Sequence, residues 1–322
     1  MTARRALVTG AGGFVGSCLA RRLISDGHDV DLIVRPGSPG WRLAELGSLA
    51  TIREVDLRDE EALRRAVAAS APDWVFHLAA HGAYSWQTDP RGIIESNLMG
   101  TLALARACCD IGFDAFVQAG SSSEYGRQDH APSEREAPEP NSYYAVSKVA
   151  ATLLCRHLAV AHGERMVTLR LYSVYGPWED PRRLMPVLVA HALRGELPPL
   201  VDPDTARDFV HVDDVCDAFL AAAGSAAATA DAIYNVGSGT QTTLGEVVDV
   251  ARTVFGVHTE PQWGSHEARS WDTDVWRADP SLIEQHLGWT AQRDLGAGMR
   301  SLADWLRLSP ALWERYRVSV AP

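Results

Sequence analysis

The chain has 322 residues, of which 46% are hydrophobic and 22% charged, and its formal net charge is −11. This composition excludes a disordered chain and a membrane-spanning one. So acidic a chain is a poor partner for nucleic acid or an anionic membrane. We expect a cytoplasmic protein, because the N-terminal sequence reaches a strand and a glycine turn at once and the five cysteines show no disulfide or metal-ligand spacing. No metal site is predicted.

The first half of the chain alternates short β-rich runs with longer amphipathic segments. The β-rich runs predict strands at 6–9, 30–34, 51–55, 74–78, 116–119 and 167–171. The amphipathic segments predict helices at 14–26, 59–68, 93–111 and 144–162. Such alternation is typical of an α/β fold, here a Rossmann doubly wound parallel sheet with helices on both faces. We therefore predict that residues 1–175 form a dinucleotide-binding Rossmann domain.

The regular alternation of strands and helices ends after about Tyr175, where prolines become frequent. Helices are predicted at 185–194, 212–224, 244–255 and 295–307, with a strand at 233–236. We expect residues 176–207 and 238–322 to form a smaller C-terminal α/β lobe that binds the substrate. Residues 208–237 are expected to return to the first domain.

The sequence VTGAGGFVG lies between the first predicted strand and the first predicted helix. It places glycines at Gly10, Gly13 and Gly16. These suit a tight turn, a close approach of the backbone to a pyrophosphate, and close packing of helix on strand. A dinucleotide would then place its phosphates at the helix N-terminus, beside Phe14 and Val15.

The end of the second predicted strand indicates which dinucleotide is bound. NAD sites usually have an acidic residue there, which holds the adenosine ribose. Here the strand ends at Val34 and Arg35 follows, while Asp31 comes too early on the strand to reach the ribose. Because an arginine at this place can pair with a 2′-phosphate, we favour NADP(H), with NAD(H) as the alternative.

The sequence YYAVSK contains two adjacent tyrosines and a lysine. Residues four apart on a helix share a face, so Tyr144 lies with Lys148, whereas Tyr143 lies with Ser147. Tyr144 is therefore the candidate acid/base. A neighbouring ammonium and a cationic nicotinamide would lower the pKa of the phenol toward the working range. Lys148 would also hold the nicotinamide ribose.

Three serines end the strand that precedes this helix, in the sequence QAGSSSEYG. A hydroxyl group of Ser121 or Ser122 could hydrogen-bond the substrate oxygen and align it for Tyr144. The glycine turn, the serines and the tyrosine–lysine pair occur in this order and at plausible distances along the chain. All three would rarely occur together by chance.

Together these motifs resemble the extended short-chain dehydrogenase/reductase family of nucleotide-sugar epimerases, dehydratases and 4-keto-reductases, over essentially the whole chain. The motifs VDLRD, FHLAA, ESNLMGT, RLYSVYGP, RDFVHVDD and ARSWDTDVW add to the resemblance. The further cofactor contacts that it implies are Asp56, Leu57, Leu78, Ala79, Ala80 and Asn97. The substrate contacts that it implies are Tyr84, Ser85, Trp86, Ser123, Ser173, Arg207, Arg269 and Asp272.

The chain departs from the dehydratases at the serine cluster. If Ser121 is the catalytic hydroxyl, Ser122 and Ser123 stand where those enzymes have an Asp and a Glu. A slip of one residue would make Ser122 the catalytic hydroxyl and Glu124 an acid, but the Asp would still be missing. This argues against dehydration.

Three functions stay open. We favour an NADPH-dependent 4-keto-reductase of a nucleotide-linked 4-keto-6-deoxyhexose, as in deoxysugar biosynthesis, over an NAD-dependent nucleotide-sugar epimerase. The third is a non-catalytic dinucleotide sensor, against which the intact Tyr144 and Lys148 argue. The expected partners are a nucleotide sugar and a second copy of the chain, since family members often form dimers through the helices that hold Asn97 and Tyr144.

Overall fold

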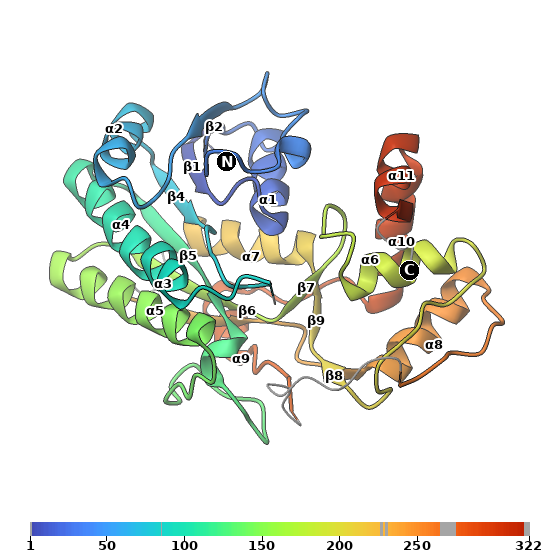
Figure 1. Cartoon of the computed structure of the whole chain (residues 1–322). Coiled ribbons are helices and arrows are strands. Elements are labelled where there is room, and N and C mark those ends of the chain that lie inside the picture. The colour runs from blue at the N-terminus through green and yellow to red at the C-terminus, as the bar shows by residue number, and fades with distance from the viewer. Residues whose placement is uncertain (1, 85, 226–227, 229–230, 265–274, 319–322) are drawn as a thin grey trace.

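The centre of the molecule is a seven-stranded parallel sheet in the order β10-β6-β5-β4-β1-β2-β3 (Figure 1). The computed structural model describes residues 2–84, 86–225, 228, 231–264 and 275–318. The strands of the sheet are β1 Arg5–Thr9, β2 Asp29–Val34, β3 Thr51–Glu54, β4 Trp74–His77, β5 Ala115–Ser121, β6 Met166–Leu171 and β10 Ile233–Val236. Because helices cover both faces, the central strands are almost continuously apolar. The predicted Rossmann fold is confirmed.

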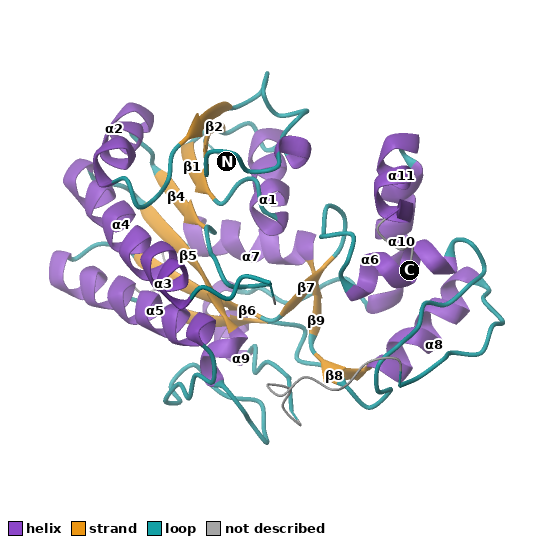
Figure 2. Ribbon diagram, in the orientation of Figure 1, coloured by secondary structure: helices purple, strands orange, loops and turns teal. Residues whose placement is uncertain are grey.

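Helices pack on the two faces of this sheet (Figure 2). One face carries α1 (Phe14–Ser25) against α7 (Val212–Gly224). The other carries α2 (Glu60–Ser70), α4 (Gly100–Ile111) and α5 (Tyr143–His162) side by side. Ser142 caps α5 by accepting a hydrogen bond from the backbone N–H of Ala145. This cap fixes where α5 begins, and so places Tyr144 in the first turn of the helix.

A smaller lobe forms around a separate apolar cluster. Its helices are α6 Leu184–Ala192, α8 Leu244–Phe255, α10 Leu295–Arg307 and α11 Pro310–Val318. Two short sheets lie near it: β7 (Ser173–Tyr175) pairs with β9 (Phe209–His211), and β8 (Ala206–Arg207) pairs with β11 (Thr242–Thr243). The chain returns to the main sheet through β10, which pairs with β6, before α9 (Ser281–Leu287).

The structure differs from the sequence prediction in its short elements. The helix expected at 93–111 begins earlier, as α3 (Pro90–Ile94), and passes through a π-helical turn, η2 (Glu95–Met99), into α4. Strands β7, β8, β9 and β11 were not predicted, because two or three residues carry no periodicity. The division of the chain at residue 175 stays a prediction. No helix among the described residues is long and apolar enough to cross a membrane.

Asp208, between β8 and β9, connects three segments of the chain through one buried carboxylate. It accepts hydrogen bonds from the backbone N–H and the hydroxyl of Ser238, both at 2.7 Å. It also accepts from the backbone N–H groups of Gly239 and Ala278, both at 2.9 Å. These bonds hold the chain after β10 against the segment that carries Arg207.

Replacing Asp208 with alanine should lower the free energy of unfolding by about 2–4 kcal/mol, because several donors lose their common acceptor. Urea denaturation followed by circular dichroism measures this loss. The exposed Asp204 in the same segment provides the control, and Asp204→Ala should change the stability by less than about 0.5 kcal/mol. Equal losses in both variants would contradict the role given to Asp208.

Candidate active site

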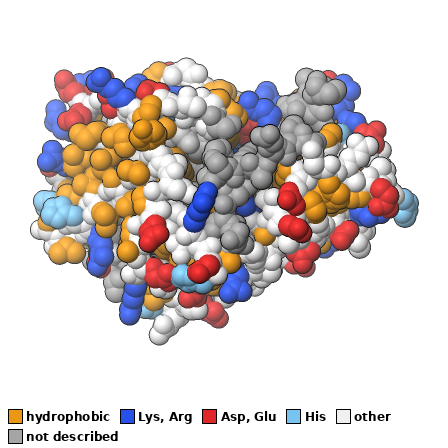
Figure 3. Space-filling model, turned by 60° about the horizontal axis from the view of Figure 1, so that its bottom comes forward, with side chains coloured by type: hydrophobic (Ala, Val, Ile, Leu, Met, Phe, Trp, Pro, Cys, Tyr) orange, Lys and Arg blue, Asp and Glu red, His pale blue; other side chains and the backbone are white. Residues whose placement is uncertain are grey.

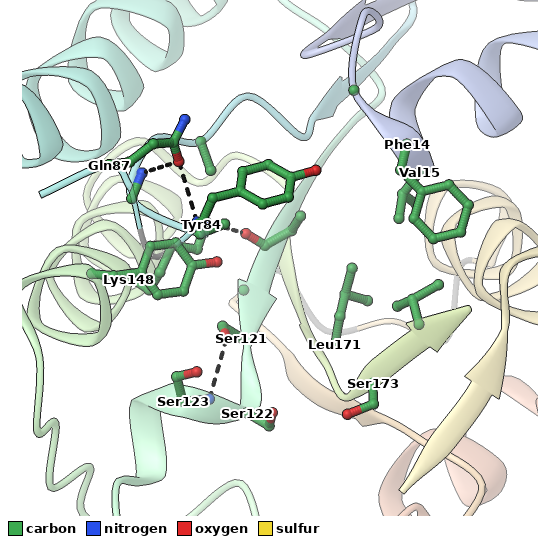
Figure 4. Close-up of a pocket in the computed structure, with 18 of the residues that line it drawn as sticks. Phe14, Val15, Tyr84, Gln87, Ser121, Ser122, Ser123, Lys148, Leu171 and Ser173 are labelled. Atoms are coloured by element: carbon green, nitrogen blue, oxygen red, sulfur yellow. Dashed lines mark hydrogen bonds between the residues drawn. The ribbon is translucent and has the colours of Figure 1, made fainter. Parts of the chain in front are cut away.

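A cleft of about 970 Å³ opens where the carboxyl ends of the central strands face the smaller lobe (Figure 4). Ligands bind α/β sheets at this edge. Most of the site residues predicted from the sequence line the cleft. They are Gly10, Gly13, Phe14, Val15, Gly16, Leu78, Ala80, Tyr84, Trp86, Ser121, Ser122, Ser123, Tyr144, Lys148, Ser173 and Arg207.

The glycine turn leaves no room for side chains. Gly10 has a φ of +69°, and a Cβ atom on it would lie 2.5 Å from the backbone nitrogen of Ala79. A Cβ atom on Gly16 would lie 2.4 Å from the carbonyl oxygen of Gly10. Among the described residues, no side chain caps α1, whose N-cap is Gly13. The turn therefore fits the pyrophosphate of a dinucleotide, which would meet the uncapped N-terminus of α1.

The residues predicted to bind the adenosine half of the dinucleotide lie outside the cleft lining. Arg35 is exposed just beyond the end of β2. Asp56 accepts hydrogen bonds from the guanidinium group of Arg58, at 2.6 Å for the shortest, and this pairing holds the pKa of the Asp56 carboxyl below its usual range. Leu57 packs closely against Gly100. None of these contacts decides which dinucleotide binds.

Asn97, in the π-helical turn η2, is buried and hydrogen-bonded through both ends of its amide. Its Oδ1 accepts from the backbone N–H of His81 at 2.7 Å, and its Nδ2 donates to the carbonyl of His81 at 2.8 Å. Nδ2 also donates to the hydroxyl of Ser147 on α5 at 2.8 Å. Asn97 thus ties the loop after β4 to α5, and the described cleft lining does not include it.

Tyr144 and Ser121 meet at the floor of the cleft. The Ser121 hydroxyl favours the phenolate of Tyr144 and so acts to lower the pKa of the phenol. Removal of the phenol from water outweighs this effect and raises the pKa of Tyr144 to about 12. The oxygen of Ser121 also accepts the backbone N–H of Ser123 at 3.2 Å, which orients the hydroxyl (Figure 4). Of the two candidate serines, Ser121 is the one whose hydroxyl affects the pKa of Tyr144.

Lys148 lies one helical turn below Tyr144 and is buried. Its Nζ donates to the carbonyl oxygen of Ala119 in β5 at 2.5 Å. Burial lowers the pKa of Lys148, and the nearby Glu124 carboxylate opposes that shift. Among the protein's own groups, burial has the largest effect on the pKa of Tyr144 and raises it, so the lowering expected from Lys148 together with a cationic nicotinamide stays a prediction.

Glu124 is fully buried and belongs to the framework of the site. Its carboxylate accepts the backbone N–H of Ser121 at 2.9 Å, the hydroxyl of Thr152 on α5 at 3.0 Å, and Nε of Arg170 on β6 at 2.9 Å. The alternative alignment, shifted by one residue, made Glu124 an acid for the substrate. The structure contradicts it, because every described contact of this carboxylate is with the protein itself. Sequence reasoning considered Glu124 only as an acid and missed this structural role.

An aromatic wall stands above this floor, in the loop after β4. The rings of Tyr84 and Trp86 stack with centroids 4.5 Å apart. Gln87 shapes the loop, because its Oε1 accepts the backbone N–H of Tyr84 at 3.3 Å (Figure 4). From the smaller lobe, Arg182 lies 4.1 Å from the Trp86 ring and Arg183 lies 5.8 Å from the Tyr84 ring. These contacts join the two lobes across the cleft.

The opposite end of the cleft holds Ser173 and Arg207. The guanidinium carbon of Arg207 lies 4.7 Å from the ring centroid of Trp276. A cation here suits an anionic ligand group. Three of the predicted substrate contacts, Ser85, Arg269 and Asp272, lie outside the described residues, so their roles stay predictions.

Three residues of the cleft wall have buried polar atoms that find no hydrogen-bond partner in the described part of the chain. These atoms are Oη of Tyr172, Oε2 of Glu179 and Nε1 of Trp276. Buried polar groups are normally paired, so unpaired ones around a cleft point to ligand contacts. Neither Tyr172 nor Glu179 was predicted as a site residue, because only the folded chain shows which polar groups lack partners. Within the same described residues, no cluster of His, Cys, Asp and Glu is placed to hold a metal ion.

A glycine turn, a Ser–Tyr–Lys set and a second lobe that meet at one cleft define a dinucleotide-dependent oxidoreductase of the extended short-chain type. Residues 6–237 match the family model of the NAD dependent epimerase/dehydratase family. The chain therefore belongs to this family of enzymes, as the resemblance implied.

Relatives of the chain carry out more than one reaction. A UDP-glucose 4-epimerase of Mycolicibacterium smegmatis is 31% identical, over 94% of this chain and 98% of its own. A dTDP-glucose 4,6-dehydratase of Streptomyces griseus is 29% identical, over 96% and 95%. The structure of a Bacillus cereus UDP-glucuronic acid 4-epimerase with UDP-glucuronic acid and NAD superposes with a TM-score of 0.82, at 26% identity, over 94% of this chain and 98% of that one.

The pH dependence of stability should reveal the buried Glu179. Burial raises its pKa from 4.5 to about 8. Between these values the folded protein keeps a proton that the unfolded chain releases, so this group makes the free energy of unfolding fall as the pH rises. Glu179→Gln removes this dependence. Relative to the wild type, the variant should gain about 2–4 kcal/mol between about pH 5 and pH 8.5.

Urea denaturation of both proteins at these two pH values measures the effect. A constant stability difference between the two proteins at both pH values would show that Glu179 titrates normally in the folded state.

Proposed function

We propose that the protein is a nucleotide-sugar epimerase that oxidises a hydroxyl group of the sugar to a ketone and reduces the ketone from the opposite face. The observation that carries this proposal is that Ser121, Tyr144 and the buried Lys148 all line one cleft between the dinucleotide turn and the smaller lobe. Relatives named as UDP-sugar 4-epimerases, which match nearly the full chain, support it.

Each residue of the set has a task that its surroundings suit. Tyr144 would take the proton of the sugar hydroxyl and later return it. Ser121 would hydrogen-bond the same sugar oxygen from which Tyr144 takes the proton. Lys148 would keep positive charge beneath the phenol, since the carbonyl of Ala119 fixes its ammonium in place. A nicotinamide dinucleotide, bound at the glycine turn, supplies the acceptor and donor of the hydride.

The same geometry argues against a dehydratase. That reaction needs an acid and a base at the sugar, and the two positions after Ser121 are the serines Ser122 and Ser123. The next carboxylate, Glu124, is engaged by Arg170, Thr152 and the backbone. Oxidation and reduction, which need only Tyr144 and its supports, fit the residues that are present.

A second candidate is the reductase that the sequence analysis placed first, which would consume NADPH to reduce a 4-keto sugar. Arg35 favours it, because an exposed arginine stands at the end of β2 where NAD enzymes usually have an acid. We favour it less, because the relatives named above carry the names of epimerases and a dehydratase, and the structure of one of them contains NAD.

Tyr144→Phe should lower the rate of sugar turnover by at least about a hundredfold, because the proton donor and acceptor is lost. Dinucleotide and nucleotide-sugar binding should persist, as calorimetry can show. The adjacent tyrosine is the matched control. Tyr143 also lines the cleft, but it is 62% exposed and shares its helix face with Ser147 rather than Lys148, so Tyr143→Phe should keep nearly the full rate. Similar rates for wild type and Tyr144→Phe would remove Tyr144 from the mechanism.

Arg35→Asp distinguishes the two cofactors. If Arg35 holds a 2′-phosphate, the variant should weaken NADPH binding by at least about tenfold relative to NADH binding, because a repulsive charge replaces an attractive one. Fluorescence titration with both dinucleotides measures the ratio. An equal change for the two dinucleotides would show that Arg35 does not contact the 2′-phosphate, and it would weaken the case for a reductase.

We also propose that a second copy of the chain covers α5. Its exposed side chains Tyr143, Val146, Leu153 and Val160 recur at helical spacing and form one apolar stripe. Figure 3 shows hydrophobic side chains gathered on the left of the molecule, where α4 and α5 lie in Figure 1.

Leu153→Glu should convert a dimer into monomers, because it places a charge in the buried stripe. Light scattering coupled to size exclusion measures the mass. Arg64→Glu on the exposed side of α2 is the control and should leave the dimer intact. A wild type that is already monomeric would refute the dimer.

A further inference from the structure

Glu179 lies in the segment between β7 and α6, where the chain leaves the Rossmann sheet for the smaller lobe. It lines the cleft, although only 6% of its surface is exposed. The roles described above for the glycine turn, the serines and the tyrosine–lysine pair do not involve Glu179. A buried carboxyl group on the wall of a binding cleft requires an explanation, because such groups are costly unless they are paired.

The backbone of Glu179 is fixed, whereas its carboxyl group is not fully paired. The backbone N–H donates to the carbonyl of Gly176 at 3.3 Å, and the carbonyl accepts the hydroxyl of Tyr316 at 2.5 Å. Oε1 lies 3.8 Å from Nε of Arg183, too far for a strong hydrogen bond. Oε2 is buried without a partner among the described residues. The main chain alone therefore accounts for the anchoring of this segment.

The neighbours of Glu179 indicate what could pair with it. Asp180 is already bound by both nitrogens of the Arg182 fork, at 3.0 and 2.9 Å, so Arg182 is engaged elsewhere. Tyr84 is close enough that Asp180 and Glu179 both help to raise the pKa of its phenol. Arg183 lies near both groups, with Nε 3.8 Å from Oε1 of Glu179 and the guanidinium carbon 5.8 Å from the centroid of the Tyr84 ring, so Glu179 and the aromatic wall flank the same arginine.

The chemistry of a carboxyl group narrows the choice of ligand group. A phosphate offers hydrogen-bond acceptors, so it could not satisfy the unpaired carboxyl oxygen of Glu179. An uncharged hydroxyl group suits Glu179 better, because it can donate to a carboxyl oxygen and accept from a protonated carboxyl. The last torsion of a Glu side chain has a broad, two-fold profile, so rotation can present either oxygen to the cleft.

We propose that Glu179 is a specificity-determining residue, which hydrogen-bonds a hydroxyl group of the sugar in the bound nucleotide sugar. This inference rests on the proposed function, since it needs a nucleotide sugar in the cleft. A buried group that awaits a hydroxyl rejects analogues that lack it, because the group would stay unpaired. Glu179 would therefore select the sugar, while the nucleotide is held elsewhere.

Two substitutions separate hydrogen bonding from packing. Glu179→Met keeps the length of the side chain and removes its oxygens, whereas Glu179→Gln keeps an acceptor and a donor. Glu196→Met, on the exposed surface after α6, controls for an added methionine in the same lobe. Calorimetry of the full-length proteins would measure the affinity for UDP-glucose and dTDP-glucose, for UDP and dTDP alone, and for NAD.

Glu179→Met should weaken binding of the sugar nucleotide by at least about tenfold. Its affinity for the nucleoside diphosphate and for NAD should change by less than about twofold, and Glu179→Gln should stay within about threefold of the wild type. Glu196→Met should match the wild type. Equal losses for the sugar nucleotide and the nucleoside diphosphate, a loss confined to NAD, or no loss would each overturn the inference.

A second measurement covers the case in which Glu179→Met does not fold. Wild type and Glu179→Gln are compared on UDP-glucose or dTDP-glucose analogues that each lack one hydroxyl. Discrimination against one missing hydroxyl should change in Glu179→Gln while the others stay the same; unchanged discrimination throughout would overturn the inference. If the wild type binds NAD but none of these sugar nucleotides, the proposed function fails and the inference falls with it.

Discussion

One buried carboxylate, that of Glu124, holds together the three elements that carry the proposed chemistry. It binds the backbone of Ser121 at the end of β5, Thr152 on α5 and Arg170 on β6. Its negative charge also favours the charged form of Lys148. Because a buried carboxylate is strongly destabilising without its partners, these bonds fix where β5 ends and how α5 lies against it. The relative position of Ser121, Tyr144 and Lys148 follows from that constraint.

The second constraint is the absence of space around the glycine turn. Gly10 presses against the end of β4 so closely that no side chain fits between them. The dinucleotide turn, the loop after β4 and the serines after β5 therefore open onto the same cleft. Asn97 also fixes the loop after β4, because its hydrogen bonds join this loop to α5. The aromatic wall of Tyr84 and Trp86 is thereby held opposite the arginines of the smaller lobe.

The sequence predicted those parts of the fold and site that follow from periodicity or from a motif at a known junction. The strands of the sheet, the glycine turn and the position of Tyr144 relative to Lys148 are of this kind. It could not predict β7 or β9, which consist of three residues each, nor the role of Glu124, whose side-chain partners are 28 and 46 residues away. Glu179 was missed for a similar reason, because its neighbours on the cleft wall come from separate segments. The burial of Tyr144, which raises the pKa of its phenol, could not be predicted either, because it is a property of the folded chain.

Full-length relatives and the Ser121–Tyr144–Lys148 set both support an epimerase that retains its dinucleotide, whereas Arg35 supports a reductase that exchanges it. The most direct test incubates the purified protein with UDP-glucose and dTDP-glucose without added dinucleotide, follows the sugar by NMR, and identifies any dinucleotide released on denaturation. The epimerase account predicts that a hydroxyl centre inverts without net oxidation and that NAD is released in near-stoichiometric amount. Protein that releases no dinucleotide, leaves both sugars unchanged and reduces a 4-keto sugar nucleotide with NADPH would contradict it.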